Sequence, residues 1–427
     1  MVKRTVLIVS PYFPPSTVAG VHRARHLVKH LPAVGWEPIV LCVDEAYHEE
    51  LLDSGLGALV PLNIEIIKVR AISAKITRSI GVGEISIRAW YFLRNSLLSL
   101  LETGRIDVVL ISGSPYYPML FARETKRRFS LPTVLDFQDP WVSHWGADQP
   151  WHSKAALVHR IATVLEPRAL RSADFVTSVS DVQNAEMLAR YPWFDASRMA
   201  AIPIGGDPDD FVVLRDTGPL QNEIELERGF VHLSYVGTFL PRGEAVVRTL
   251  FRAFARLRVT RPALASRIRL NFVGTSNQPR EVSIYRVRSI AEAEGVAEAV
   301  REIPGRVFYL HALSVLARSN GVLLLGSEEP HYTASKIYPG LMCGRPYLSL
   351  FHRSSSAHAI LAAAGGGRAL AFETRGELAE LENAIAESLQ TLALTPEHLG
   401  VPNPAVYEPF QANYIASRFA KIFDSLV

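Results

Sequence analysis

The stretch from Gly321 to Pro346, GVLLLGSEEPHYTASKIYPGLMCGRP, constrains the fold more than any other part of this 427-residue chain. Its apolar run 322–325 is bounded by glycines, which favours a strand buried on both faces of a parallel sheet. A polar loop follows, and residues 333–335 are suited to begin a helix that carries Lys336. Because free N–H groups and the helix dipole attract anions, this pattern indicates either a phosphate site or an ordinary βα unit with a solvated lysine.

Length and composition limit the class of protein. A chain of 427 residues exceeds what one hydrophobic core usually serves, so we expect two domains of about 200 residues each. A hydrophobic content of 48% with 20% charged residues excludes a disordered chain. The net charge of only +3 gives no reason to expect a nucleic-acid partner.

The cysteines and the N-terminus bear on location. Cys42 and Cys343, the only two cysteines, form neither a disulfide framework nor a zinc-binding pattern, which favours a reducing compartment. The apolar run 5–9 is too short for a signal peptide, and no window approaches the roughly 20 apolar residues that span a bilayer. We therefore expect a cytoplasmic protein, and contact with the inner face of a membrane stays open.

The N-terminal half has the pattern of a doubly wound sheet. A strand at 6–9, a proline-rich loop, a helix at 21–33 and a strand at 38–43 form a βαβ unit. The loop lacks G-x-G-x-x-G, so a dinucleotide fingerprint is absent. Two later buried strands, 107–112 and 133–136, lead into polar and aromatic residues. Ligands gather at the carboxyl ends of such strands, so these residues should border a cleft.

The segment 68–128 carries most of the charge asymmetry, with an excess of lysine and arginine. Within it, residues 85–101 have the apolar spacing of an amphipathic helix. A basic helix that bears aromatic residues can lie on an anionic membrane. The same pattern also fits a helix that packs on its own sheet with solvated arginines, and the sequence leaves both interpretations open.

The C-terminal half repeats the α/β pattern. After a polar stretch at 208–229 that resembles a linker, a strand at 231–236 leads through a glycine-containing loop to a helix at 244–258. A strand at 268–274 and helices at 284–294 and 311–318 follow. The last stretch, 407–427, has apolar residues at helical spacing, which predicts a packed terminal helix.

The stretch from Gly321 onward resembles the donor-binding segment of retaining, family-4-like glycosyltransferases of the GT-B fold, Ser-Lys-x-x-Glu-Tyr-x-x-x-Gly-x-Pro. Ser335, Lys336, Gly344 and Pro346 match that pattern. Pro339 stands where the family has a glutamate that contacts the donor.

The partner glutamate of the family's E-x7-E pattern is replaced as well. His331 stands at its position, and Glu328 and Glu329 lie about one turn earlier as possible substitutes. This departure puts the usual donor geometry in doubt.

The N-terminal half carries matching segments. Ala19 and Gly20 stand at the family's glycine pair, where a small residue lets the backbone approach a ligand. The stretch 136–141, D-F-Q-D-P-W, resembles the D-x-R-D-x-W segment of enzymes that build surface polysaccharides. Residues 202–211 resemble the I-P-x-G-x-D-x-x-x-F segment that ends the domain, where Gly205 and Gly206 form a plausible hinge.

The resemblance implies a GT-B fold, an α/β architecture of two Rossmann-like domains with a terminal helix that returns to the first. The expected divisions are residues 1–206 for the acceptor, 207–404 for a nucleotide-sugar donor, and 405–427 for that helix. The donor-binding residues it implies are Gly20, Gly237, Thr238, Arg242, Glu328, Glu329, His331, Ser335 and Lys336. The acceptor-binding residues it implies are Ser114, Tyr116, Asp139 and Trp141.

Three of these residues are candidates for catalysis. Arg242 and Lys336 are suited to neutralise the leaving diphosphate, so neither a metal nor a cofactor is expected. Asp139 is suited to orient or deprotonate an acceptor hydroxyl. Asp139 also fits a simple helix N-cap before Pro140, and this alternative stays open.

The expected activity is retaining, hexosyltransferase-type transfer to a glycan, lipid-linked or small-molecule acceptor in polysaccharide or glycoconjugate synthesis. Pro339 keeps two alternatives open. One is a GT-B epimerase or pseudo-glycosyltransferase, and the other is a binding protein with little catalytic power.

Overall fold

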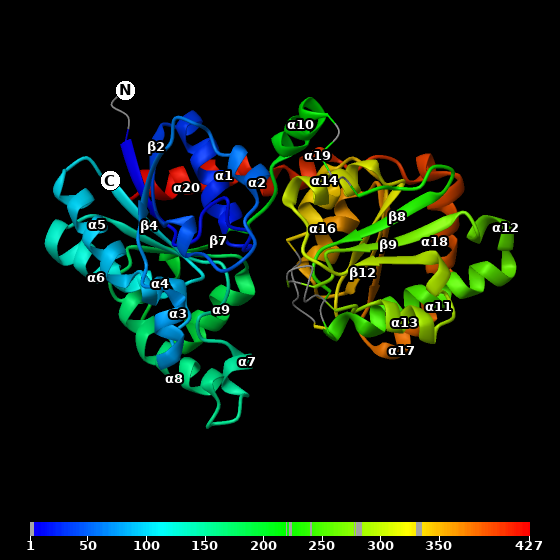
Figure 1. The fold of residues 1–427 in the computed structure, drawn as a ribbon, viewed down its shortest axis with the longest axis horizontal. Coiled ribbons are helices and arrows are strands. Elements are labelled where there is room, and N and C mark those ends of the chain that lie inside the picture. Colours follow the sequence, from blue (N-terminus) through cyan, green and yellow to red (C-terminus); the bar gives the residue numbers. More distant parts are fainter. Residues whose placement is uncertain are drawn as a thin grey trace. The chain divides into compact units, whose positions relative to one another are not determined.

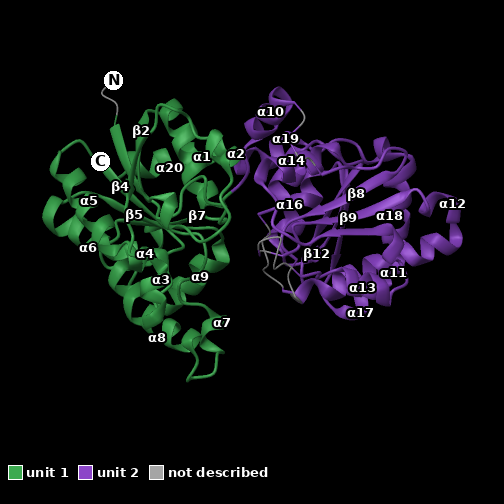
Figure 2. Ribbon diagram, viewed as in Figure 1, with its two compact units in different colours: residues 1–204, 412–427 green, residues 205–411 purple. Residues whose placement is uncertain are grey.

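The computed structural model describes residues 4–218, 220–221, 224–239, 241–276, 278, 284–329 and 335–427. The chain divides into two compact units (Figure 2). Unit 1 comprises Met1–Ile204 and Ala412–Val427, and unit 2 comprises Gly205–Gln411. Residues 405–411, which we expected to go with the terminal helix, lie in unit 2, where the Gly206 N–H donates to the Phe410 carbonyl at 3.0 Å.

Unit 1 is built on a seven-stranded sheet in the order β3-β2-β1-β4-β5-β6-β7 (Figure 1). All neighbouring strands are parallel, and Val6 of β1 lies opposite both Pro38 and Val108. The strands are β1 (Arg4–Val9), β2 (Trp36–Val43), β3 (Glu65–Val69), β4 (Val108–Gly113), β5 (Thr133–Phe137), β6 (Phe175–Ser178) and β7 (Met199–Ala201). The central strands are buried throughout, as continuous apolar runs in a parallel sheet require.

Helices cover both faces of this sheet. The terminal helix α20 packs beside α1, and both contribute to the core on the face of Val6 and Ile8. Helix α5 contributes to the core on the face of Leu7 and Val9. The helices are α1 (Val21–His30), α2 (Ser54–Ala58), α3 (Ala74–Thr77), α4 (Ile85–Arg88), α5 (Trp90–Glu102), α6 (Ala122–Glu124), α7 (His144–Ala147), α8 (Lys154–Leu170), α9 (Asp181–Arg190) and α20 (Ala412–Asp424).

Unit 2 is built on a six-stranded parallel sheet in the order β10-β9-β8-β11-β12-β13. Its strands are β8 (Val231–Val236), β9 (Ile268–Val273), β10 (Val300–Ile303), β11 (Gly321–Leu325), β12 (Tyr347–His352) and β13 (Gly367–Phe372). Its helices are α10 (Pro208–Thr217), α11 (Glu244–Thr260), α12 (Pro262–Ala265), α13 (Arg288–Ala293), α14 (Tyr309–Arg318), α15 (Ile337–Met342), α16 (Ser356–Ala364), α17 (Arg375–Glu380), α18 (Glu382–Leu394) and α19 (Pro404–Tyr407).

Each sheet has one point at which the strand order reverses. In unit 1 the reversal lies between β1 and β4, and in unit 2 it lies between β8 and β11. Loops diverge to opposite faces of the sheet at such a point and leave a crevice at the carboxyl ends of the strands. The topology therefore identifies the loops after β1, β4, β8 and β11 as the places to look for a site.

Several predicted elements differ from the structure. The polar stretch expected as a linker contains α10, because Asp207 accepts from the Asp209 N–H as N-cap and Pro208 occupies the first turn. The helix predicted at 284–294 is only α13, Arg288–Ala293. The amphipathic helix predicted at 85–101 is divided into α4 and α5 at Ala89.

The structure also tests for membrane-spanning segments. Within the described ranges, no helix is both long enough and apolar enough to cross a bilayer.

Candidate active site

Three of the predicted donor residues of unit 2, Gly237, Thr238 and Lys336, lie together at the carboxyl end of β8. The Lys336 ammonium donates a hydrogen bond to the Tyr235 hydroxyl and lies 4.2 Å from the centre of the Tyr235 ring. The Tyr235 hydroxyl donates in turn to the Thr238 carbonyl at 2.9 Å. Lys336, from the start of α15, is thereby attached to the loop that follows β8.

Gly237 allows this close approach. Its φ of 130° is one that L side chains rarely adopt, and a Cβ there would lie 3.4 Å from Lys336 Cδ. The lysine chain therefore lies over the glycine. The helix that we expected to begin at residues 333–335 begins later, with Lys336 itself at the N-cap.

The position of Lys336 changes its acidity. Burial lowers the pKa of the Lys336 ammonium to about 7, because the charged form loses hydration. Near neutral pH this amine is therefore divided between its charged and neutral forms. A phosphate beside the Lys336 amine would favour its charged form, so binding of an anion should be coupled to uptake of a proton.

Arg242 lies in the short 3-10 helix Pro241–Gly243 before α11. Its guanidinium is mostly exposed and pairs with Glu329 at 2.6 Å. Its carbonyl accepts from the Glu328 N–H at 3.1 Å, so the loops after β8 and β11 are in contact. Arg242 and Lys336 thus come from adjoining loops at the switch point of unit 2.

The acids that could replace the family glutamates are both engaged by arginines. Glu328 forms a bidentate ion pair with Arg375, and Glu329 pairs with Arg242. Ser335 is exposed, and its carbonyl accepts from the Tyr338 N–H at 3.2 Å. His331, the remaining predicted donor residue, lies outside the described residues.

In unit 1, Gln138 of the loop after β5 joins the loop after β1 to the end of β4. Its side-chain amide donates to the Gly20 carbonyl at 3.2 Å and to Ser112 Oγ at 2.7 Å. A Cβ on Gly20 would lie 3.4 Å from both Gln138 Oε1 and the Ser114 carbonyl. Gly20 and the exposed Ser114 are therefore neighbours at the switch point of this sheet, and the Gln138 side-chain oxygen is buried without a hydrogen-bond partner.

Three of the four predicted acceptor residues, Tyr116, Asp139 and Trp141, lie together in one cluster. The Tyr116 ring stacks on Trp141, with centroids 5.4 Å apart and planes inclined by 13°. The Tyr116 hydroxyl donates to the Asp139 carbonyl at 2.9 Å. Tyr117 meets Trp141 edge-on at 6.0 Å. This arrangement brings Asp139, Tyr116 and Trp141 together as the sequence predicts.

The structure rejects the N-cap alternative for Asp139. The next helix, α7, begins at His144, and its N-cap is Ser143, which accepts from the Gly146 N–H. Burial of the carboxyl group raises the pKa of Asp139, although the residue keeps an exposed surface. Burial, together with the nearby Asp139 charge, raises the pKa of Tyr116 well above its ordinary value. An acid with a raised pKa is better suited to accept a proton near neutrality.

Sequence reasoning missed the residues that hold this cluster in place. Asp136 is fully buried and accepts from Arg23 Nε at 3.1 Å, Ser112 Oγ at 3.0 Å and Thr177 Oγ1 at 2.7 Å. Glu166 of α8 is also buried and accepts from the Val142 N–H at 3.0 Å. Acids in otherwise apolar strands or helices need partners, and that signal could have identified Asp136.

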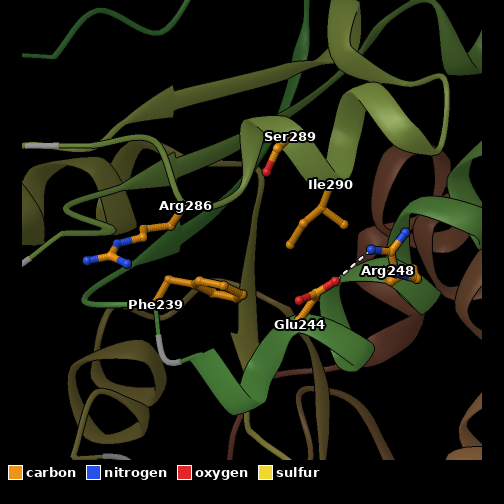
Figure 3. Close-up of a pocket in the computed structure, with 6 residues that line it drawn as sticks. All are labelled: Phe239, Glu244, Arg248, Arg286, Ser289 and Ile290. Carbon is orange, nitrogen blue, oxygen red and sulfur yellow. Dashed lines mark hydrogen bonds and ion pairs between the residues drawn. The ribbon is translucent and has the colours of Figure 1, made fainter.

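A pocket that the sequence did not indicate lies on the β9 side of the loop after β8. It measures about 350 Å³ and lies between the N-terminal parts of α11 and α13 (Figure 3). The Phe239 ring and the Glu244 carboxylate face it, and Glu244 pairs with Arg248 at 2.6 Å (Figure 3). Ser289 and Ile290 line it from α13. Of the described residues, none of the predicted donor residues lines the pocket, but Phe239 belongs to the loop after β8 that carries Gly237 and Thr238.

Two Rossmann-like sheets, each with its loops of interest at a switch point, define the GT-B fold. Residues 19–205 match the family described as the glycosyl transferase 4-like domain. The expected resemblance to family-4-like GT-B glycosyltransferases, and the expected fold class, are thereby confirmed. Among curated proteins, no sequence matches this chain.

Solved structures show the same fold over the whole chain. HepE of Anabaena in complex with UDP-glucose is 14% identical, with a TM-score of 0.60 and coverage of 99% of this chain and 100% of that one. WaaG, a glycosyltransferase involved in lipopolysaccharide biosynthesis, is 14% identical, with a TM-score of 0.57 and coverage of 99% of each chain. A UDP-forming trehalose-phosphate synthase of Burkholderia xenovorans is 12% identical, with a TM-score of 0.61 and coverage of 99% of each chain. At these identities the likeness is one of fold.

Proposed function

We propose that this chain transfers a hexosyl group from a nucleoside-diphosphate sugar to a hydroxyl of a glycan, lipid-linked or small-molecule acceptor, with retention and without a metal ion. The observation that carries the proposal is the attachment of Lys336 to Tyr235 and Gly237 beside the Arg242 loop. Positive groups held at a switch point suit a diphosphate. The complex of HepE with UDP-glucose supports a nucleotide sugar as the donor class.

In the proposed reaction, Lys336 and Arg242 act on the leaving group and Asp139 acts on the acceptor. The bond between the anomeric carbon and the diphosphate oxygen breaks, and Lys336 and Arg242 stabilise the charge that develops on the leaving group. The acceptor oxygen bonds to the same carbon, and its proton needs a base, for which Asp139 is the candidate. The Tyr116 and Trp141 rings stack on each other, and Trp141 is buried, so this pair would hold the loop that carries Asp139 in place. Arginine and lysine supply the positive charge that a metal would otherwise provide.

A panel of UDP, GDP, ADP and TDP sugars, each with and without candidate glycan and lipid-linked acceptors, tests the proposal. We expect release of the nucleoside diphosphate with one donor class, dependent on an acceptor and unaffected by EDTA. Loss of activity in EDTA that added Mg²⁺ or Mn²⁺ restores would overturn metal independence. The configuration of the product at the anomeric carbon, read by NMR, would overturn retention if it were inverted.

A second candidate function has one observation in its favour. Glu328 and Glu329 are paired with arginines, and residue 339 is proline, so the donor loop shows no unengaged acid at these positions. The missing glutamate at position 339 favours a GT-B epimerase or pseudo-glycosyltransferase as the second candidate. Incubation with donor alone separates the cases, because an epimerase changes the donor sugar without an acceptor. Calorimetric binding of a nucleotide sugar with no conversion under any condition would instead indicate a binding protein.

A further inference from the structure

Helix α8 carries its large apolar side chains on the outside. Leu157, Ile161 and Val164 are 51%, 38% and 49% exposed, and their spacing puts them on one side of the helix. The buried side is made largely of small residues such as Ala156 and Ala162. A surface helix usually shows the reverse arrangement, so this ridge is not explained by packing within unit 1.

A second exposed apolar ridge lies in residues 72–80. Ile72, Ile76 and Ile80 recur every four residues and are 47%, 66% and 77% exposed. Ile76 lies in α3, Ile80 ends the 3-10 helix Arg78–Ile80 that follows it, and Ile72 lies two residues before α3. Three exposed isoleucines in so short a segment are unusual for a surface that meets only water.

The two ridges are neighbours. Lys154 Nζ, at the start of α8, donates to the Gly81 carbonyl at 2.9 Å, directly after Ile80. Figure 1 shows α3 beside α8 at one end of unit 1. Trp151, 78% exposed, lies just before α8, and its carbonyl accepts from Arg160 at 3.2 Å. We call the two ridges together with Trp151 the α3–α8 surface.

The charged side chains on the elements of the α3–α8 surface are mostly cationic, although Arg78 pairs with the exposed acid Glu49 at 3.0 Å. Lys75, Arg160 and Arg168 are exposed on the same elements. The only carboxylate in the α8 sequence is Glu166, which is fully buried, and residues 72–80 contain no acid. An apolar centre with a cationic rim and a tryptophan at its edge complements an anionic lipid surface better than it complements water.

We propose that the α3–α8 surface docks on an anionic lipid bilayer, with its aliphatic side chains in the interfacial region and its lysine and arginine side chains at the headgroups. The proposal goes beyond the transferase reaction and does not depend on it. It also places membrane contact away from residues 85–101, because Leu93, Leu97 and Leu101 of α5 are buried in the core of unit 1.

Flotation of the whole chain with vesicles tests this surface without any turnover. Wild-type protein should bind vesicles of phosphatidylcholine mixed with phosphatidylglycerol more strongly than vesicles of phosphatidylcholine alone, and high salt should weaken the binding. The triple variant Ile76→Ser, Ile80→Ser, Leu157→Ser should lower the vesicle affinity by about tenfold or more, because it removes the apolar contact.

The control replaces apolar residues elsewhere that are even more exposed: Leu62→Ser, Val259→Ser and Val401→Ser, at 104%, 83% and 79% exposure. This control should bind vesicles like the wild type. The pair Lys75→Glu and Arg168→Glu should remove the preference for anionic vesicles. Unchanged thermal transitions in all variants exclude misfolding as the cause of lost binding.

Tryptophan emission gives an independent readout. Addition of anionic vesicles should shift the emission to shorter wavelength, and Trp151→Phe should reduce the shift. Absence of wild-type binding to either vesicle, or full binding by the triple variant, overturns the proposal. A triple variant that changes the sedimentation coefficient of the free protein, while the wild type ignores vesicles, would show instead that a second copy covers the surface.

Discussion

The Lys336 ammonium lies 4.2 Å from the centre of the Tyr235 ring and donates a hydrogen bond to the Tyr235 hydroxyl. A cation over an aromatic face is stabilised by the ring quadrupole, although burial still lowers the pKa of this lysine to about 7. The side chain is therefore held at the end of β8 before any ligand arrives. A lysine side chain that is already held in one conformation loses less conformational entropy when a diphosphate binds.

Replacement of Lys336 tests its role in transfer. Lys336→Ala should lower turnover of the donor by about two to three orders of magnitude, since it removes a charge that stabilises the leaving diphosphate. Tyr235→Phe, which keeps the ring and removes the hydroxyl, should have a smaller effect, about tenfold or less. Release of the nucleoside diphosphate gives the rates. Unchanged kinetics of Lys336→Ala would remove this lysine from the site.

The lowered pKa of Lys336 predicts a pH dependence. The diphosphate needs the charged amine, so kcat/KM for the donor should fall as the pH rises through about 7. Lys336→Arg stays charged at all these pH values, so that inflection should disappear in the variant. Donor binding near pH 7.5 should also take up protons, which calorimetry in buffers of different ionisation enthalpy detects. A wild-type profile that is flat across this range would contradict the prediction.

Local patterns of sequence predicted the core elements well. The predicted strand over the apolar run 322–325 lies within β11, and the predicted strand at 231–236 is β8. The pairing of Lys336 with Tyr235 was not predictable, because Tyr235 lies 101 positions away in what reads as an ordinary strand. The same limit applies to Gln138, whose bonds to Gly20 and Ser112 depend on how loops from different strands meet.

Glu329 should compete with the donor for Arg242. The pair is short, at 2.6 Å, but both side chains are exposed, so its strength in water is modest, about 1 kcal/mol or less. Glu329→Gln should therefore lower the KM for the donor a few-fold, most clearly at low salt, and Arg242→Ala should raise it. Glu373→Gln, which changes an exposed acid that pairs with Arg353, is the control and should leave KM unchanged. A higher KM in Glu329→Gln would assign that acid to donor binding.

Asp139 should act in the reaction and not in folding. Asp139→Asn should lower kcat by about 10²-fold or more with little change in donor affinity, because the amide cannot accept the acceptor's proton. It should not change the melting temperature, since Ser143 is the residue that caps α7. Ser143→Ala is the contrasting variant and should destabilise by about 1 kcal/mol. Normal kcat in Asp139→Asn would exclude the carboxylate as the base.

The buried pair of Arg23 with Asp136 should contribute strongly to the stability of unit 1. Both side chains are almost completely buried, and Arg23 also donates to the carbonyls of Pro203 and Ile202. Asp136→Ala leaves a buried guanidinium without its counter-charge, which should cost about 3–5 kcal/mol of unfolding free energy. Glu65→Ala breaks the exposed pair with Arg105 in the same unit and should cost about 1 kcal/mol or less. Urea denaturation of both variants checks the difference. Asp136 also accepts from Ser112, which in turn accepts from Gln138, so the Asp136→Ala substitution should also loosen the loop that carries Asp139. An equal loss of unfolding free energy in Asp136→Ala and Glu65→Ala would contradict the prediction that this buried network stabilises unit 1.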